Sequence, residues 1–210
     1  DIKKKGIWCF SFYKHHTREN MDIERKGNLV RLLDIDSDFI IDLRYATADN
    51  FTGQKVYQSG ECWIDEHTAA ILIQAKNIFR ADGYRVKVWD AYRPIRAQKK
   101  FWEIMPNDDF VARPPEVSKM TSFRHTHMNG QCVDLTLTDL DGNDIEMPCP
   151  FDTMDGRASL ACPDNPPAGT KNGEYLKRVM ESVGFEAYDG EWWHFYDVST
   201  QPVPYTDYEI

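Results

Sequence analysis

Long apolar runs are missing from this sequence of 210 residues, and so is any excess of positive charge. A membrane-spanning helix needs about 18 or more consecutive apolar residues, and no stretch of the chain reaches that length. The formal net charge is −9, without a basic stripe that would attract nucleic acid or anionic lipid. The composition therefore argues against a membrane span and against nucleic-acid or membrane partners.

Cysteine motifs that bind metals are missing too. The five cysteines form no C-x-x-C pair, so we expect no cysteine-ligated zinc; they are Cys9, Cys62, Cys132, Cys149 and Cys162. Cys149 and Cys162 flank an irregular stretch and would be placed to form a disulfide in an oxidising compartment, whereas free thiols fit a reducing cytosol. The helical zinc motif H-E-x-x-H is also absent.

Repeats and low-complexity segments are absent as well, and 41 % hydrophobic residues suffice for one core. We expect one domain over residues 21–210, preceded by an N-terminal extension over residues 1–20. If Met21 is the start of the protein, a cytoplasmic location is favoured. If residues 1–20 follow a removed leader, the protein would be periplasmic or secreted. The sequence does not indicate an oligomeric state.

Hydrophobic periodicity predicts helices and strands without the regular βαβ order of a parallel sheet. Helices are expected over residues 63–82, 94–101 and 176–183. Strands are expected over residues 84–90, 131–138 and 192–198. Asp65 is a candidate N-cap, and Gly184 is a candidate helix stop. The pattern favours an α+β domain with a mostly antiparallel central sheet flanked by helices.

Imidazole and carboxylate side chains gather in two short segments. Asp134 follows His127 by seven residues, and Glu191 precedes His194 by three. Catalytic zinc takes three ligands of these kinds and keeps a fourth position for water, whose pKa it lowers to about 7. A glutamate nearby can accept the proton of that water and pass it to a leaving amine. The sequence therefore predicts a zinc hydrolase site.

The local pattern around these residues is compatible with such a site. Gly130 permits a tight turn between His127 and the strand that follows. Asp134 lies on the strand face opposite to an apolar stripe, so its carboxylate does not point into the core. Glu191 and His194 would face opposite ways in one continuous strand. We therefore expect Glu191 to lie in the turn before the last strand, or a bulge to intervene.

Five ordered motifs make the sequence resemble the VanX-type D-alanyl-D-alanine dipeptidases, zinc peptidases that share a fold with the hedgehog signalling domain. The family pattern S-x-H-x-x-G-x-A-x-D is similar to residues 125–134, and E-x-W-H matches residues 191–194. The segments YAT-x-DNFTG, D-x-YRP and FD-x-MD match residues 45–53, 90–94 and 151–155. The resemblance extends over most of the chain and implies the same fold.

The resemblance implies roles for the matched residues. One zinc ion per chain would be bound by His127, Asp134 and His194. Glu191 would act first as general base and then as general acid. Arg93 would stabilise the oxyanion of the tetrahedral intermediate, a role that suits a fixed guanidinium. Without the resemblance, Arg93 would be interpreted as a structural arginine that follows a strand.

The resemblance also implies a substrate cleft that contains Tyr45 and Asp152. The Asp152 carboxylate would hold the free ammonium group of a dipeptide, although the residue alone would be interpreted as a turn cap. In two positions the sequence departs from the family, because His125 replaces a serine and Cys132 replaces an alanine. The serine lies near the substrate in the family, so His125 is a candidate substrate-binding residue that alters how the peptide is held. Neither departure removes a candidate ligand or base.

Three functions are compatible with these residues. The first is zinc-dependent hydrolysis of D-alanyl-D-alanine, in glycopeptide resistance or in peptidoglycan recycling. The alternative is a D,D-carboxypeptidase or L,D-endopeptidase on peptidoglycan stem peptides, which would need a longer and more open cleft. The third is a binding protein with a structural zinc, which would be expected to lack Glu191 or Arg93. The matches at residues 45–53 and 151–155 favour the dipeptidase.

Overall fold

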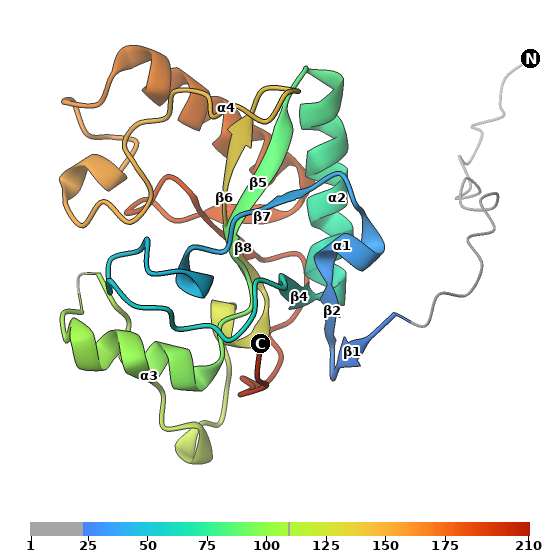
Figure 1. Ribbon diagram of the computed structural model, residues 1–210, viewed down its shortest axis with the longest axis vertical. Coiled ribbons are helices and arrows are strands. Elements are labelled where there is room, and N and C mark those ends of the chain that lie inside the picture. The colour runs from blue at the N-terminus through green and yellow to red at the C-terminus, as the bar shows by residue number, and fades with distance from the viewer. Residues whose placement is uncertain (1–22, 109) are drawn as a thin grey trace, which may run out of the picture.

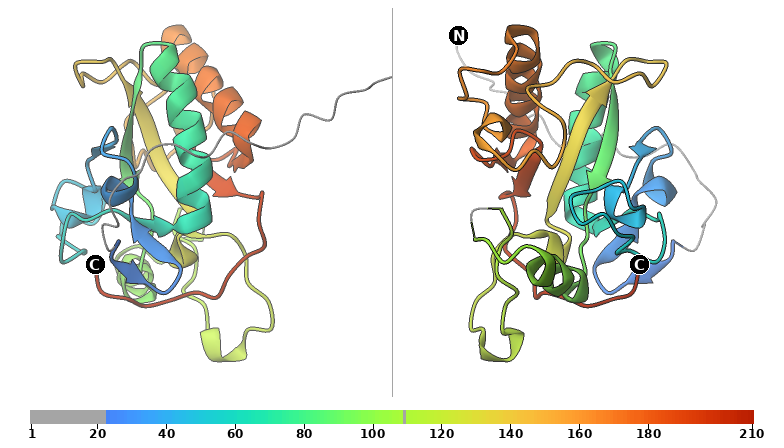
Figure 2. Two further views of the ribbon diagram at one scale, coloured as in Figure 1. Left: turned by 90° about the vertical axis from the view of Figure 1, so that its right-hand side faces the viewer. Right: turned by 60° about the vertical axis from the view of Figure 1, so that its left-hand side comes forward.

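The computed structural model describes residues 23–108 and 110–210, so the expected N-terminal extension over residues 1–20 lies outside the described residues. Two β-sheets and four α-helices make up the described part of the chain (Figure 1). The large sheet has the strand order β3-β5-β6-β8-β7, and the small sheet has the order β1-β2-β4. Helices α2 and α4 pack against each other and cover the same face of the large sheet (Figure 2).

The bounds of the elements are as follows. The large sheet contains β3 (Ile40–Ile41), β5 (Arg85–Asp90), β6 (Cys132–Thr138), β7 (Phe185–Ala187) and β8 (His194–Asp197). The small sheet contains β1 (Arg25–Lys26), β2 (Leu29–Arg31) and β4 (Trp63–Asp65). The helices are α1 (Leu32–Ile35), α2 (Glu66–Ala81), α3 (Ile95–Ile104) and α4 (Pro167–Val183).

The large sheet is mostly antiparallel, which confirms the predicted α+β class. Its one parallel pair joins β3 to β5, and the pairs β5–β6, β6–β8 and β7–β8 are antiparallel. The register places Asp90 opposite Asp134, and Asp134 opposite His194. Three polar residues therefore lie in one row across neighbouring strands, although their sequence positions are far apart.

The core lies between the large sheet and the helices that cover it. Val133, Leu135 and Leu137 of β6 are fully buried, as the alternation predicts. The α2 face formed by Leu72 and Phe79 is fully buried as well. Each such side chain contributes about 1.5–3 kcal/mol when it leaves water. This burial holds β6, which carries Asp134, at the centre of the fold.

Three predicted elements have clearly different bounds in the structure. The helix expected over residues 176–183 begins earlier, because α4 starts at Pro167, a residue that suits the first turn of a helix. The helix expected over residues 63–82 is wrong at its start, because Trp63–Asp65 forms β4 and pairs with β2. Asp65 is nevertheless the N-cap of α2, and its carboxylate accepts from the backbone N–H of His67 and Thr68. The last strand begins only at His194, since the residues before it form a turn.

The predicted helix stop at Gly184 is confirmed. Gly184, with φ +113°, ends α4 in the left-handed conformation that favours glycine. Cys149 and Cys162 are free thiols rather than a disulfide. None of the described helices has both the length and the apolar character that crossing a bilayer requires.

Candidate active site

A cavity of about 270 Å³ lies beside the strand row formed by β5, β6 and β8. All three candidate metal ligands line it, together with Glu191 and Arg93. Tyr45 and Asp152 line it from two segments far away in the sequence. The structure therefore brings together seven of the eight residues selected from the sequence: Tyr45, Arg93, His127, Asp134, Asp152, Glu191 and His194.

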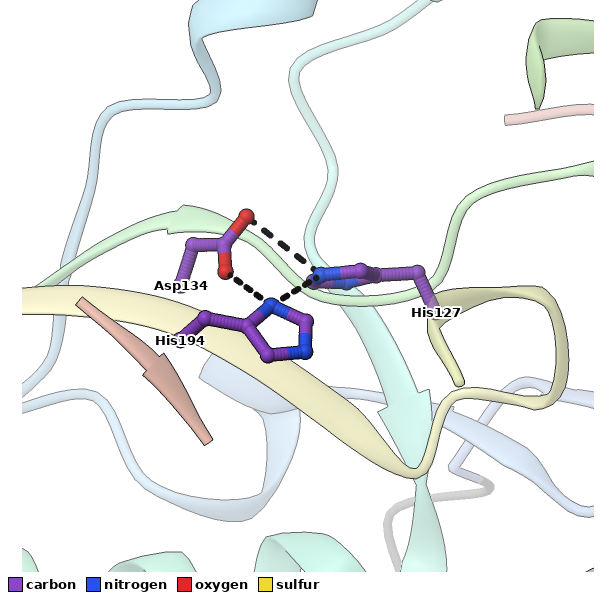
Figure 3. Close-up of side chains that lie close together, drawn as sticks. All are labelled: His127, Asp134 and His194. Carbon is purple, nitrogen blue, oxygen red and sulfur yellow. Dashed lines mark hydrogen bonds and ion pairs between the residues drawn. The ribbon is translucent and has the colours of Figure 1, made fainter. Parts of the chain in front are cut away.

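The three candidate ligands are buried and face one another (Figure 3). His127 Nε2 lies 3.1 Å from His194 Nδ1 and 3.3 Å from Asp134 Oδ2. The other carboxylate oxygen, Asp134 Oδ1, lies 2.8 Å from His194 Nδ1. Two imidazole nitrogens and a carboxylate that converge at such distances form a donor set that suits zinc.

The tautomer of His127 is fixed from outside this cluster. Its Nδ1 lies 2.7 Å from the backbone carbonyl oxygen of Ala91, and a carbonyl can only accept a hydrogen bond. The neutral ring therefore carries its proton on Nδ1 and offers the lone pair of Nε2 to the cluster. Orientation of a metal-binding histidine by a second hydrogen bond of this kind is common in metal sites.

The backbone around His127 is held by its own sequence. His127 belongs to a short 3₁₀ helix, His127–Asn129, which begins with a capping box between Thr126 and Asn129. Gly130 ends it with φ +76°, and a Cβ there would lie 2.7 Å from the backbone nitrogen of Asp65. The prediction that Gly130 permits the turn into β6 is confirmed.

Electrostatics within the cluster favour a charged carboxylate. Burial opposes the ionisation of Asp134, but the two adjacent imidazoles outweigh burial and hold its pKa below the usual range. Burial also opposes protonation of His127, and here the Asp134 carboxylate outweighs it and raises the pKa of the imidazole. The cluster thus attracts positive charge, which is what binding of a cation requires.

Arg93 is fixed beside the candidate ligands. Its Nε and Nη2 donate to Asp90 Oδ2 at 3.0 and 2.8 Å, and its guanidinium lies over the ring of Phe101. Nη2 is 3.9 Å from Asp134 Oδ2. Asp90 is itself held by the hydroxyl of Tyr57, which donates to Oδ1 at 2.7 Å. The guanidinium is thus oriented before any substrate arrives.

Glu191 lies in the turn between β7 and β8, which is the first of the two arrangements expected from the sequence. Its backbone N–H donates to the carbonyl oxygen of Tyr188, and its own carbonyl oxygen accepts from the N–H of His194. Burial raises the pKa of the Glu191 carboxyl group, and His194 partly offsets that effect. A carboxyl group with a raised pKa exchanges protons more readily near neutral pH, as acid–base catalysis requires.

Asp152 lines the cavity, and its two carboxylate oxygens have different surroundings. Its Oδ1 accepts a hydrogen bond of 3.0 Å from the hydroxyl of Tyr45, whereas its Oδ2 is buried without a partner. Burial raises the pKa of the Asp152 carboxyl group to about 7. Its φ of +59° is costly for a residue other than glycine, and strain of this kind gathers at functional sites. The Phe151 ring, packed on Trp89 and Trp193, holds this turn in place.

His125 is not among the residues that line the cavity. Its Nε2 lies 2.9 Å from the backbone carbonyl oxygen of Thr200, so the ring is directed to the chain that follows β8. Cys132 is fully buried next to the cluster but is not among the three residues whose ligand atoms converge. Neither departure from the family pattern therefore alters the candidate ligand set.

Asp90 and Gln98 are two further residues at the site for which the sequence predicts no role. Asp90 opens the D-x-YRP motif, which was a signal that it serves Arg93 three residues later. Gln98 carried no such signal, because its contacts with Arg93 and with the backbone of Ala112 are visible only in the folded chain.

The cavity, the three converging ligands, the half-buried glutamate and the fixed guanidinium are typical of hydrolases that use one metal ion. The chain belongs to the D-ala-D-ala dipeptidase family of metallopeptidases, because that family matches residues 25–209.

Two dipeptidases with similar sequences agree with this assignment. The chain is 35 % identical to a D-alanyl-D-alanine dipeptidase of Escherichia coli, with 80 % of this chain and 83 % of the relative covered. It is also 35 % identical to a D-alanyl-D-alanine dipeptidase of Enterococcus faecium, over 80 % and 91 % of the two chains. A vancomycin resistance D,D-pentapeptidase solved with Zn(II) aligns with a TM-score of 0.41 and 16 % identity, over 68 % and 76 %.

Proposed function

We propose that this protein hydrolyses the dipeptide D-alanyl-D-alanine with the help of one zinc ion bound by His127, Asp134 and His194. The observation that carries the proposal is the convergence of these ligands with Glu191 and Arg93 on one small cavity. Membership of the dipeptidase family supports the choice of substrate. The proposed catalytic domain comprises residues 21–210.

Zinc bound at this site would polarise the scissile carbonyl and lower the pKa of the attacking water. Glu191 accepts the proton of that water on its carboxylate and then donates it to the nitrogen of the leaving D-alanine. Burial raises the pKa of the carboxyl group, which is the direction that favours proton transfer in both steps. General acid–base catalysis of this kind contributes roughly 10²- to 10⁴-fold to the rate.

Arg93 stabilises the negative charge that develops on the carbonyl oxygen. Asp90 fixes the guanidinium, so no reorganisation is needed when that charge forms. The 3.9 Å separation between Arg93 Nη2 and Asp134 Oδ2 places its positive charge next to the metal ligands. Its role is therefore electrostatic, as a fixed donor beside the reacting carbonyl.

Asp152 and Tyr45 bind the free ammonium group of the substrate. The unpaired Oδ2 of Asp152 is an acceptor that a protonated amine can satisfy. A stem peptide has an amide at the equivalent position and offers no such charge. The cavity of about 270 Å³ also falls below the roughly 300–1,000 Å³ that is common for ligand sites. Both features favour a dipeptide over the longer substrates of a carboxypeptidase.

A cytoplasmic location is part of the proposal, with a periplasmic or secreted location as the alternative. It is supported by the four cysteines in the described part of the chain, Cys62, Cys132, Cys149 and Cys162, which are free thiols.

The deciding experiment measures zinc content and release of D-alanine for the wild type and for Glu191→Ala. We expect one zinc per chain in both proteins and hydrolysis by the wild type alone. D-alanyl-D-alanine, L-alanyl-L-alanine and a pentapeptide ending in D-alanyl-D-alanine are assayed side by side. Faster cleavage of the pentapeptide would favour the carboxypeptidase, and absence of zinc would refute the metal site.

A further inference from the structure

Gln98 is a buried residue of α3 that lines the cavity and has no part in the proposed chemistry. Its side chain is 3 % exposed. Its amide oxygen accepts a hydrogen bond of 2.9 Å from Arg93 Nη1, and its amide nitrogen donates one of 2.6 Å to the carbonyl oxygen of Ala112. Ala112 belongs to a stretch of cavity wall that we name the 110–112 segment. One side chain thus joins the catalytic guanidinium to that segment.

The chemistry of the two partners fixes the direction of the amide. A guanidinium only donates hydrogen bonds and a carbonyl oxygen only accepts them. The oxygen of Gln98 must therefore face Arg93, and its nitrogen must face Ala112. A glutamate at this position would keep the bond from Arg93 but would place a carboxylate against the Ala112 carbonyl. An aliphatic side chain would satisfy neither partner.

Among the described residues, the other contacts of the 110–112 segment lie within its own loop or in the core. The backbone N–H groups of Phe110 and Val111 donate to the carbonyl oxygen of Asn107, within the same loop. Val111 is 4 % exposed and anchors the segment by its side chain. The bond from Gln98 differs from these contacts because it connects the loop to α3 and, through Gln98, to Arg93.

The guanidinium of Arg93 is held by hydrogen bonds on two sides, one to Asp90 and one to Gln98. Of the five N–H bonds of a guanidinium, three are used by Asp90 and Gln98. Asp90 fixes Nε and Nη2, whereas Gln98 fixes Nη1. Loss of Gln98 would free one edge while Asp90 keeps the group near the metal ligands.

We propose that Gln98 is a positioning residue that couples the orientation of Arg93 to the order of the 110–112 segment. The inference rests on the proposed function, in which Arg93 acts on the substrate. Because Asp90 remains in place, loss of the coupling raises KM more than it lowers kcat. Without the coupling, part of the free energy of substrate binding is used to order the 110–112 segment, so KM rises. The charged groups that act in the chemical step stay in place, so kcat changes less.

Gln98→Glu is the discriminating variant, because it keeps the bond from Arg93 and loses the bond to Ala112. Hydrogen exchange of the backbone amides of residues 110–112 is measured together with kcat and KM for D-alanyl-D-alanine. We expect exchange at least several-fold faster, a KM raised about 3- to 10-fold, as for one lost hydrogen bond, and kcat within about 3-fold. Lys99→Ala, the exposed neighbour on α3, is the matched control and should change none of these.

Arg93→Lys tests the coupling by changing the partner of the Gln98 amide oxygen. Its effect is measured by hydrogen exchange, which needs no substrate turnover. Lysine cannot hold Asp90 and Gln98 together, so exchange in the 110–112 segment should rise in this variant as well. Unchanged exchange in either variant, or a loss of kcat at constant KM in Gln98→Glu, would overturn the coupling. If the wild type does not cleave the dipeptide, the proposed function fails, and the exchange rates still decide the coupling.

Discussion

Replacement of Asp152 by asparagine should make the protein more stable and a poorer dipeptidase at the same time. The variant removes a buried carboxylate whose Oδ2 has no partner. Asparagine keeps an oxygen that can accept from the Tyr45 hydroxyl, and it tolerates the left-handed conformation, here φ +59°. The variant therefore changes the charge while it preserves shape and backbone.

The effect on stability depends on pH in a defined direction. The pKa of Asp152 rises from 3.8 to about 7 on folding, so between these values the folded protein binds a proton that the unfolded chain does not. Stability therefore falls as pH rises through this window. The penalty is complete above pH 7 and has a ceiling of about 4 kcal/mol. Asp152→Asn should raise the free energy of unfolding at pH 8 and have little effect near pH 4.

The effect on catalysis has the opposite sign. In the proposed function only the ionised Asp152 attracts the substrate ammonium, so kcat/KM of the wild type should rise about tenfold per pH unit below pH 7 where Asp152 alone controls that limb. Loss of a charge-assisted hydrogen bond costs about 1.5–3 kcal/mol, which corresponds to a 10- to 150-fold lower kcat/KM for Asp152→Asn above pH 7.

The assay combines urea unfolding at pH 4 and pH 8 with steady-state kinetics from pH 5 to pH 9. Asp155→Asn is the matched control, because its carboxylate is half-exposed and pairs with Arg157. An unchanged KM for Asp152→Asn, or an equal loss for the control, would refute the role in ammonium binding. Lower stability of Asp152→Asn at pH 8 would refute the explanation that burial of the ionised Asp152 carboxylate destabilises the folded protein.

Three further results are expected. Glu191→Gln should retain one zinc and lose roughly 10²- to 10⁴-fold in kcat, as measured by D-alanine release; substantial residual activity would exclude Glu191 as the base. Tyr45→Phe removes the hydrogen bond that lowers the pKa of Asp152, so the acidic limb of kcat/KM should move to higher pH; a shift to lower pH would contradict the contact. Gly130→Ala should lower stability by about 1–3 kcal/mol and also weaken zinc binding, because φ is +76° and Cβ would meet the Asp65 backbone; wild-type stability in urea would contradict this.

Much of the candidate site could be predicted because its parts are local in sequence. Alternation along β6 predicted the face of Asp134, and the three-residue spacing predicted that Glu191 lies in a turn before His194. The β4 strand could not be predicted, because three residues before a good N-cap look like the start of the helix. Its partner β2 is more than 30 residues earlier in the chain.

The remaining features depend on contacts between distant segments. The resemblance suggested that His125 contacts the substrate, yet the structure turns its ring to Thr200, and this role stays a prediction. The positive φ of Asp152 and the link from Gln98 to Ala112 have no signature in local sequence. Such details are decided by loops whose packing is set by the whole fold.

The position of Asp134 opposite His194 makes strand register a condition for metal affinity. A slip of β8 by one residue would turn His194 to the other face of the sheet and dismantle the ligand set. Chains with misaligned strands would therefore bind zinc poorly, whereas correctly paired chains gain stability in proportion to the logarithm of the free zinc concentration. At the proposed zinc site, the ion would thus favour chains with the correct strand register, and the yield of active protein would depend on zinc during folding.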